Sequence, residues 1–255
     1  MAKPQAHLIS PDPSLMQRQP PLKMIPLPEA SSSLIGFAER DIRARPFKLL
    51  RTLLGKQLAG DGCKIIGVTS PSPNAGKSFL ASNLAAAMSR VATDKILIAD
   101  FDFQRATIAA LFGIVNPPGI TDYLLGKVDG LASLLHGVEN TNLIIAPSLL
   151  GADNSAELLA GERLTELIAA LRAYAEDGMV ICDLPPLFVS DDALLVAKHL
   201  DGILMVVEQG VTTKKQLEAS IEIIYPTKLV GTVFNRYAGS FGNPYGYDGL
   251  YGGYY

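Results

Sequence analysis

Short apolar runs alternate with longer amphipathic stretches from residue 63 to residue 234, and this alternation is the main structural signal in the sequence. Six of the runs are six or seven residues long, rich in β-branched residues and almost continuously apolar, so they predict strands. Apolar character on both sides of a strand is typical of a parallel sheet that is covered on both faces. The predicted strands span residues 64–70, 95–100, 142–148, 178–183, 202–207 and 228–234.

Helical periodicity fills the segments between these strands. The predicted helices cover residues 77–91, 161–176, 190–199 and 212–224. A further helix is predicted at 46–58, because its apolar residues fall on one face and Pro46 suits a first helical turn. These apolar residues are Phe47, Leu50, Leu53 and Leu54. The regular alternation of strands and helices predicts an α/β fold with a doubly wound, mostly parallel sheet.

The two ends of the chain lack this alternation. Seven of the 17 prolines lie in the first 33 residues, so residues 1–31 are interpreted as a flexible Pro/Ser-rich arm. Residues 32–236 form the predicted folded domain. Residues 237–255 are rich in Gly and hold six of the nine tyrosines, which predicts a mobile tail.

Charge and apolar runs exclude several classes of protein. The formal net charge of −3 argues against a general binder of nucleic acid or of anionic membranes. No apolar run approaches the roughly 20 residues of a transmembrane helix. The N-terminal sequence lacks the apolar core of a signal peptide, so we expect a cytoplasmic protein.

The strongest chemical signal is the sequence SPSPNAGKS at residues 70–78, which lies between a predicted strand and a predicted helix. In that context a Gly-rich loop cradles phosphates with its backbone N–H groups and the helix N-terminus. Pro71 stands where the general pattern GxxxxGK[ST] has Gly, and prolines lack the N–H donor. The cradle must therefore use the end of the loop. The predicted nucleotide-binding residues are Asn74, Ala75, Gly76, Lys77 and Ser78.

Carboxylates stand at the ends of two predicted strands. ILIADFD ends in Asp100 and Asp102, and VICDLPP contains Asp183. Taken singly, each could be a helix cap or a turn residue. The carboxyl ends of parallel strands meet beside the phosphate loop, where oxygen ligands hold Mg²⁺ directly or through water. The predicted metal shell is Ser78, Asp102 and Asp183.

The ordered set of motifs resembles the bacterial tyrosine autokinases of capsule and exopolysaccharide synthesis, the BY-kinases, which are P-loop relatives of the MinD/ParA class. SPSPNAGKS looks like Walker A, ILIADFD like the additional Walker A′ motif, and VICDLPP like Walker B. The terminal tyrosine cluster adds to the resemblance, as do NSAELLAGERL, DGILMVVEQGVTTKKQ and VFNRY. The resemblance implies a P-loop NTPase fold that binds ATP with Mg²⁺.

The resemblance also implies a reaction and its partners. ATP would be the phosphoryl donor, and a neighbouring copy in a homo-oligomeric ring would phosphorylate the tail. A membrane polysaccharide co-polymerase, here a separate chain, would activate the kinase and recruit it to the inner face of the cell membrane. A cognate tyrosine phosphatase would reverse the modification, and the cycle would regulate polymer synthesis and export. The implied phosphoacceptors are Tyr245, Tyr247, Tyr251, Tyr254 and Tyr255.

Catalytic roles follow from the chemistry of the acceptor. A tyrosine hydroxyl has a pKa of about 10 and arrives protonated, so a carboxylate must take its proton. Asp100 is the first choice for this base and Asp102 the second, with Lys77 neutralising the phosphates. Asn235 resembles the adenine contact of this class, and a turn residue after a strand explains it equally well.

Two departures from the family pattern keep other functions open. The pattern D-x-D-x-R reads with Gln104 in its last place and Arg105 one position late. The ring-contact pattern E-x-x-R-x-x-R aligns with Arg45, Lys48 and Arg51, so a cation replaces the acid. The alternatives are an ATP-binding assembly module with weak kinase activity and a MinD/ParA-like ATPase switch. Against the switch, the early loop lysine of KGGxGK is absent, and a basic amphipathic terminal helix is replaced by Gly and Tyr.

Overall fold

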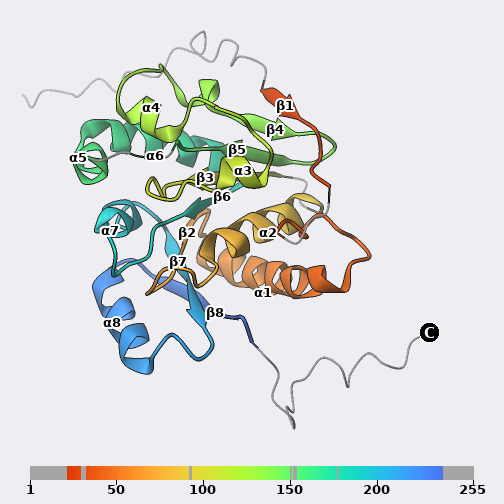
Figure 1. Ribbon diagram of the computed structural model, residues 1–255, viewed down its shortest axis with the longest axis vertical. Helices are drawn as coiled ribbons and strands as arrows, with labels where there is room; N and C mark the ends of the chain where they lie inside the picture. The colour runs from red at the N-terminus through yellow and green to blue at the C-terminus, as the bar shows by residue number, and fades with distance from the viewer. Residues whose placement is uncertain are drawn as a thin grey trace, which may run out of the picture.

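A computed structural model describes residues 22–29, 33–91, 94–149, 151, 154–176 and 178–237. In these residues eight strands form one sheet in the order β1-β4-β5-β3-β6-β2-β7-β8 (Figure 1). Neighbouring strands are parallel except for the antiparallel pair β4–β5. The strands are β1 (Lys23–Ile25), β2 (Ile65–Thr69), β3 (Lys95–Asp100), β4 (His136–Val138), β5 (Leu143–Ala146), β6 (Gly178–Asp183), β7 (Gly202–Glu208) and β8 (Leu229–Asn235). The predicted doubly wound, mostly parallel sheet is confirmed.

Helices cover both faces of this sheet. They are α1 (Arg45–Asp61), α2 (Lys77–Ser89), α3 (Ile108–Leu111), α4 (Ile120–Leu124), α5 (Ser155–Ala160), α6 (Glu162–Glu176), α7 (Asp192–Ala197) and α8 (Lys214–Ile224). α1, α2 and α3 pack on one face, and the other five pack on the opposite face. The predicted first helix is confirmed: Pro46 lies in its first turn, and Gly62 ends it in the left-handed conformation. Phe47 and Leu54 are buried as expected, but Leu53 was wrongly placed on the apolar face, because it is exposed to solvent.

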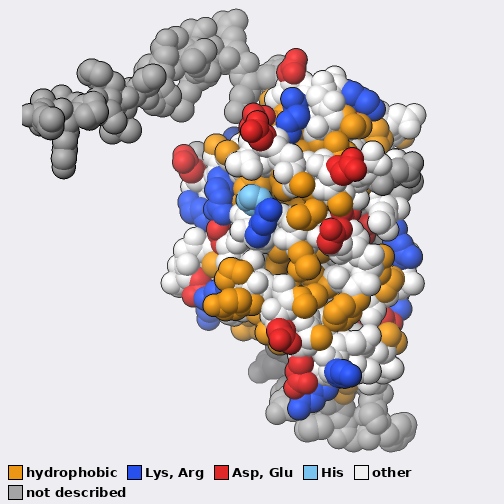
Figure 2. All heavy atoms as spheres, turned by 90° about the vertical axis from the view of Figure 1, so that its left-hand side faces the viewer, with side chains coloured by type: hydrophobic (Ala, Val, Ile, Leu, Met, Phe, Trp, Pro, Cys, Tyr) orange, Lys and Arg blue, Asp and Glu red, His pale blue; other side chains and the backbone are white. Residues whose placement is uncertain are grey.

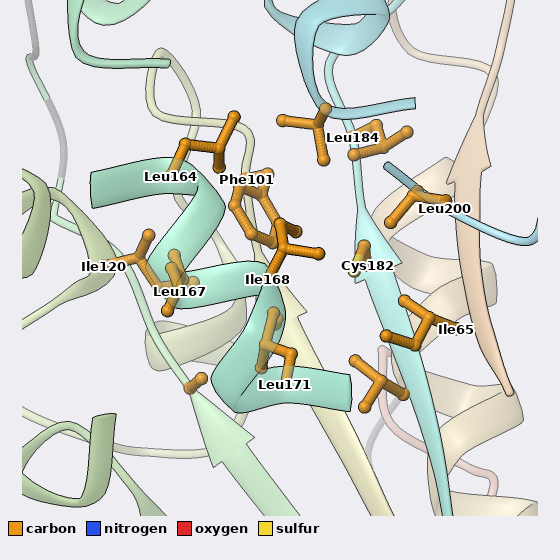
Figure 3. Close-up of a cluster of buried hydrophobic side chains, with 14 of the residues drawn as sticks. Ile65, Phe101, Ile120, Leu164, Leu167, Ile168, Leu171, Cys182, Leu184 and Leu200 are labelled. Carbon is orange, nitrogen blue, oxygen red and sulfur yellow. The ribbon is translucent and has the colours of Figure 1, made fainter. Parts of the chain in front are cut away.

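Two apolar clusters, one on each face, form the core. All five residues of β2 are buried, and its side chains alternate, so Ile65 joins one cluster and Ile66 the other. α6 contributes a buried stripe at helical spacing that includes Leu167 and Leu171, and Figure 3 shows this stripe packed toward Phe101 and β6. Burial on both faces explains why the central strands read as continuous apolar runs.

The N-terminal part of the structure corrects one expectation. Residues 23–25 lie within the predicted flexible arm, yet they form β1, which pairs in parallel with β4. Glu139 continues the pairing, because its N–H donates to the Ile25 carbonyl at 3.0 Å. A strand of three residues beside prolines is ordered by its pairing with the neighbouring strand β4. The proline content of the segment does not reveal this pairing. Residues 1–21 and the tail 238–255 lie outside the described residues.

β4 and the short helices α3, α4 and α5 were not predicted from the sequence either. Each has only three to six residues, which is too short for a periodic apolar pattern to be recognised. α7 is shorter than the helix predicted at 190–199. The two missed strands, β1 and β4, lie at one edge of the sheet, so the predicted central strands are unaffected.

A buried amide joins the segment before α1 to the middle of α2. The Asn83 side chain accepts the N–H groups of Ile35 and Gly36, both at 2.7 Å. Its own NH₂ group donates to the carbonyls of Ser33 at 3.0 Å and Phe79 at 2.8 Å. All four hydrogen bonds of the amide are therefore made inside the protein, and they fix this segment against α2.

Candidate functional site

The strand order brings the three predicted motifs to one edge of the sheet. β6 lies between β3 and β2, and Asp183 at its end is in register with both Asp100 and Val68. The loop 70–76 leaves β2 at this same edge and leads directly into α2. Since carboxyl ends of parallel strands form the usual crevice for ligands in such sheets, this edge is the candidate site.

Backbone conformation at the end of the loop depends on one glycine. Asn74 and Gly76 both have positive φ, at 65° and 89°. A Cβ atom on Gly76 would lie 2.3 Å from Nδ2 of Asn235, so no other residue fits here without movement. The same Nδ2 donates to the carbonyl of Ala75 at 2.8 Å. Asn235, the candidate adenine contact, thus braces the phosphate loop.

The first half of the loop is tied to the segment that follows β6. The Thr69 hydroxyl donates to the Pro185 carbonyl at 2.7 Å, and the Leu187 N–H donates to the Ser70 carbonyl at 2.9 Å. The Phe188 N–H donates to the carbonyl of Pro71 at 3.2 Å. Pro71 replaces a glycine of the general pattern, and its carbonyl is used to hold the two segments together.

Lys77 lies between two buried carboxylates. Its ammonium donates to Oδ2 of Asp102 at 2.5 Å and to the Ser78 hydroxyl at 3.2 Å, and it is 3.8 Å from Oδ1 of Asp183. Burial lowers the pKa of Lys77, but the charges of Asp183, Asp102 and Asp100 outweigh it, so the net pKa is raised. Lys77, at the start of α2, is therefore positively charged at neutral pH.

Asp183 is a buried carboxylate whose two oxygens have no hydrogen-bond partner among the described residues. Burial raises its pKa to about 6, while the nearby Lys77 ammonium and Ser78 hydroxyl lower it in part. Buried polar atoms without partners need an explanation, and a cation ligand is one. Hydroxyl and carboxylate oxygens from Ser78, Asp102 and Asp183 are the donors that Mg²⁺ prefers, so the residues present fit this ion.

Protein ligands alone do not form a complete metal cage here. Within the described ranges, no group of three or more His, Cys, Asp or Glu side chains is arranged to hold a metal ion. Mg²⁺ in nucleotide enzymes is held by one or two carboxylates together with substrate phosphates and water. The site is of that open kind.

Asp100 supports the backbone beside the site. It is fully buried, and its carboxylate accepts the N–H groups of Asp102 at 3.1 Å and Ile108 at 3.2 Å. Burial, followed by the charge of Asp183, raises its pKa well above the ordinary value. Of the two carboxylates considered as a base, Asp102 accepts the Arg105 N–H on Oδ1 at 3.2 Å and the Lys77 ammonium on Oδ2, whereas both oxygens of Asp100 accept backbone N–H groups.

A cavity of about 290 Å³ opens over these groups. Sequence reasoning did not place Arg105 or Arg236 in the site. Arg105 donates to the Asn74 side chain at 2.6 Å, and Arg236 donates to Glu208 at 2.7 Å. The signal that could have revealed Arg105 was its displaced position in the Walker A′ pattern. For Arg236 the signal was its position directly after Asn235. The cavity is lined by Asn74, Gly76, Lys77, Ser78, Arg105, Thr107, Pro186 and Arg236.

Two further groups of predicted residues lie elsewhere. Arg45, Lys48 and Arg51 are on α1, where Arg51 donates to the Ala87 carbonyl of α2 at 3.1 Å. The nearby acid is Glu39, whose side-chain carboxylate pairs with Arg90 at the C-terminal end of α2. Its backbone carbonyl accepts a hydrogen bond from Lys48 of α1. The five predicted phosphoacceptor tyrosines lie outside the described residues.

The chain matches the family described as the CobQ/CobB/MinD/ParA nucleotide binding domain over residues 66–250. It is 31% identical over 204 residues to tyrosine-protein kinase CpsD of Streptococcus pneumoniae, a match that covers 78% of this chain and 86% of that protein. It is 30% identical over 213 residues to tyrosine-protein kinase wzc of Salmonella typhimurium, covering 81% of this chain. The chain spans 29% of the length of that longer relative.

Solved structures agree with this assignment. The crystal structure of the chimerical protein CapA2B2 superposes with a TM-score of 0.73 at 28% identity, over 86% of this chain and 95% of that chain. No helix in the described part of the chain is both long and apolar enough to cross a membrane. The family match and the sequence relatives agree with the phosphate loop and the carboxylates of this site. The chain belongs to the CobQ/CobB/MinD/ParA nucleotide-binding family and, within it, to the bacterial tyrosine-protein kinases.

Proposed function

We propose that the chain transfers the γ-phosphoryl group of ATP to tyrosine hydroxyls in the tail of a neighbouring copy. One arrangement carries the proposal. The carboxylates of Asp102 and Asp183 lie within 3.8 Å of the Lys77 ammonium, and Lys77 lines a cavity of about 290 Å³. A MinD/ParA-like switch would share the loop and the carboxylates. The relatives that match this chain by sequence, however, are named tyrosine-protein kinases.

ATP is the substrate that the cavity suits. Its phosphates would face the N–H groups of residues 74–78, and Lys77 would neutralise the β and γ phosphates. Arg105 and Arg236 add two positive charges to the wall of the cavity. Phosphoryl transfer needs charge neutralisation and positioning more than covalent chemistry, so this cationic wall fits the reaction.

Ser78 and Asp183 would hold the magnesium ion, and Asp102 would reach it through a water molecule. When bound, Mg²⁺ supplies charge neutralisation at the β and γ phosphate oxygens. The Lys77 ammonium donates to Asp102 at 2.5 Å, and a phosphate of the nucleotide would be a further acceptor for the same group. A lysine that turned toward the phosphate would leave the Asp102 carboxylate able to act on the acceptor.

The acceptor tyrosine must lose its proton as the new bond forms. Its phenolic oxygen bonds to the γ phosphorus, the bond between that phosphorus and the β–γ bridging oxygen breaks, and ADP leaves. We assign the proton to Asp102, because only one of its oxygens accepts a backbone N–H and the other faces the Lys77 ammonium, whereas both oxygens of Asp100 accept backbone N–H groups. Asp100 is then a positioning residue that holds the turn of Asp102. The acceptors are Tyr245, Tyr247, Tyr251, Tyr254 and Tyr255.

The assembly and its partners are part of the proposal. The kinase forms a ring, a separate membrane-bound co-polymerase activates it at the inner face of the membrane, and a phosphatase removes the phosphates. Each phosphate adds about −1.5 to −2 charges, so modification of the five acceptor tyrosines would add roughly −7.5 to −10. Repulsion between such tails would dissociate the ring. If the phosphorylated and the phosphatase-treated protein formed oligomers of the same size, this step would be contradicted.

The test is to incubate the full chain with Mg-ATP and to locate phosphotyrosine by mass spectrometry. Phosphotyrosine should accumulate in residues 245–255, and Lys77→Met should abolish it. Lys56→Met, a change of an exposed lysine on α1, is the matched control and should behave like the wild type. Phosphate release without phosphotyrosine would support the ATPase switch, and the absence of both products would support the assembly module.

A further inference from the structure

Two apolar side chains are exposed on the loop between β6 and α7, next to the cavity. Phe188 is 47% exposed and Val189 is 49% exposed. The side of the molecule that carries α5, α7 and α8 faces the viewer in Figure 2, and apolar side chains gather over it. Exposed apolar groups that cluster near a cavity mark a surface for a partner or a ligand.

The loop that carries this pair is fixed to the phosphate loop. The N–H groups of Leu187 and Phe188 donate to the carbonyls of Ser70 and Pro71, and the Val189 N–H closes a turn on the Pro186 carbonyl at 3.1 Å. Pro186 itself lines the cavity. Two residues span at most about 7.6 Å between Cα atoms, so the Phe188 backbone lies within that distance of Pro186 in the cavity wall.

The tail begins at the same cavity. Asn235 contacts the phosphate loop through Ala75, and Arg236 lines the cavity wall, so residue 237 starts beside the site. Tyr245 is nine residues beyond Arg236, and nine extended residues span up to about 30 Å. The tail of the same copy, or of a copy beside it, is therefore long enough to bring a tyrosine to Phe188. Residues 237–255 contain one acid and no Lys or Arg, which suits an apolar surface.

We propose that Phe188 and Val189 form the subsite that receives the acceptor tyrosine. This inference rests on the proposed kinase function and deepens it, because it names the surface that selects the acceptor. The phenol ring of the tail packs against the Phe188 ring, and the hydroxyl reaches the groups at the floor of the cavity. The Phe188 ring also favours tyrosine over serine or threonine, since aromatic pairs gain free energy beyond the burial of their area.

The experiment uses the full chain with its five tail acceptors changed to Phe, and a peptide of residues 237–255 as the substrate. Phe188→Ala should raise the KM for the peptide by roughly three- to tenfold. Phe188→Leu, which keeps apolar area without the ring, should lie between the wild type and Phe188→Ala. The KM for ATP should be unchanged in both variants.

Val189 offers a matched pair of substitutions. Val189→Ser should raise the KM for the peptide about two- to threefold, from loss of part of one apolar contact. Val91→Ser makes the same chemical change at a residue that is 62% exposed. Val91 follows the far end of α2, whose 13 residues place it about 20 Å from Lys77. Val91→Ser should leave the KM for the peptide unchanged.

The possible failures can be told apart. A wild-type peptide reaction with equal KM values for wild type and Phe188→Ala overturns the subsite and leaves the kinase function standing. A raised KM for ATP with an unchanged KM for the peptide assigns Phe188 to the nucleotide and also overturns it. A change in oligomer mass by light scattering without a change in KM makes the pair a subunit contact. A wild-type chain that never phosphorylates the peptide overturns both proposals.

Discussion

Lys77 and Asp102 are bound to each other at 2.5 Å, although 25 residues separate them in the sequence. The lysine belongs to the first turn of α2, and the carboxylate follows β3. Both groups are almost fully buried, so this pair is strong and each partner compensates for the burial of the other. Nucleotide and Asp102 compete for the same ammonium group.

This competition predicts an unusual property of Asp102→Asn. Without magnesium, the variant should bind ADP several-fold more tightly than the wild type, because its lysine loses the hydrogen-bonded carboxylate of Asp102 and keeps only the more distant Asp183. With Mg-ATP, phosphoryl transfer should fall by about 100-fold or more, since the proton acceptor is lost. Calorimetry in EDTA and a phosphotyrosine assay measure the two effects. Weaker ADP binding in EDTA would contradict the competition.

Asp183 predicts how the metal-free protein responds to pH. Its pKa is raised from 3.8 to about 6 by burial, so between these values the folded chain binds more protons than the unfolded chain. The stability that this group contributes is complete below pH 3.8 and is lost as the pH rises through 6. At about 1.36 kcal/mol per pKa unit, the loss is about 3 kcal/mol.

Asp183→Asn should remove this loss and be more stable than the wild type at pH 8 in EDTA. Urea denaturation at pH 5 and pH 8 measures the difference. Asp191→Asn, at an exposed position, should show the wild-type pH response. Magnesium with ADP should stabilise the wild type at pH 8 and should have little effect on Asp183→Asn; a similar gain in both would remove Asp183 from the metal shell.

Neighbouring residues on α2 predict opposite effects on stability. Asn83→Leu removes four hydrogen bonds and leaves two backbone N–H groups buried without partners, so it should cost about 3 kcal/mol. Ser82→Ala removes a buried hydroxyl that has no partner among the described residues, so it should be neutral or stabilise the fold by up to about 1 kcal/mol. Chemical denaturation measures both changes, and equal losses would refute the role of the amide.

Gly76 and Gly113 allow a steric effect to be separated from backbone strain. Both have positive φ, at 89° and 70°, so Ala at either position should cost about 1 kcal/mol in stability. A Cβ on Gly76 would meet Asn235 at 2.3 Å, whereas the space around Gly113 is open within 4 Å. Gly76→Ala should therefore weaken ADP binding at least tenfold in titrations, and Gly113→Ala should not. Equal affinities would show that the loop can move.

Motifs with a fixed backbone context were predictable from the sequence. Lys77 and Ser78 follow from a loop between strand and helix, and Asp183 follows from its place at the end of a buried strand. The division of roles between Asp100 and Asp102 was not predictable, because it depends on which carboxylate has an oxygen directed at Lys77 and which has both oxygens on backbone N–H groups. Arg236 was missed for a similar reason: its φ of 56° sets its direction. β1 was missed because a strand of three residues depends on its partner.

The hydrogen bond from Asn235 to the Ala75 carbonyl has a mechanical consequence. The residue that ends β8 is also the residue that braces the phosphate loop, and the tail begins two residues later. Any force on the tail, whether from a neighbouring copy that holds it or from the repulsion between phosphates, is transmitted across one amide to the loop that grips the nucleotide. The substrate segment is thus attached to the part of the enzyme that its own modification would disturb.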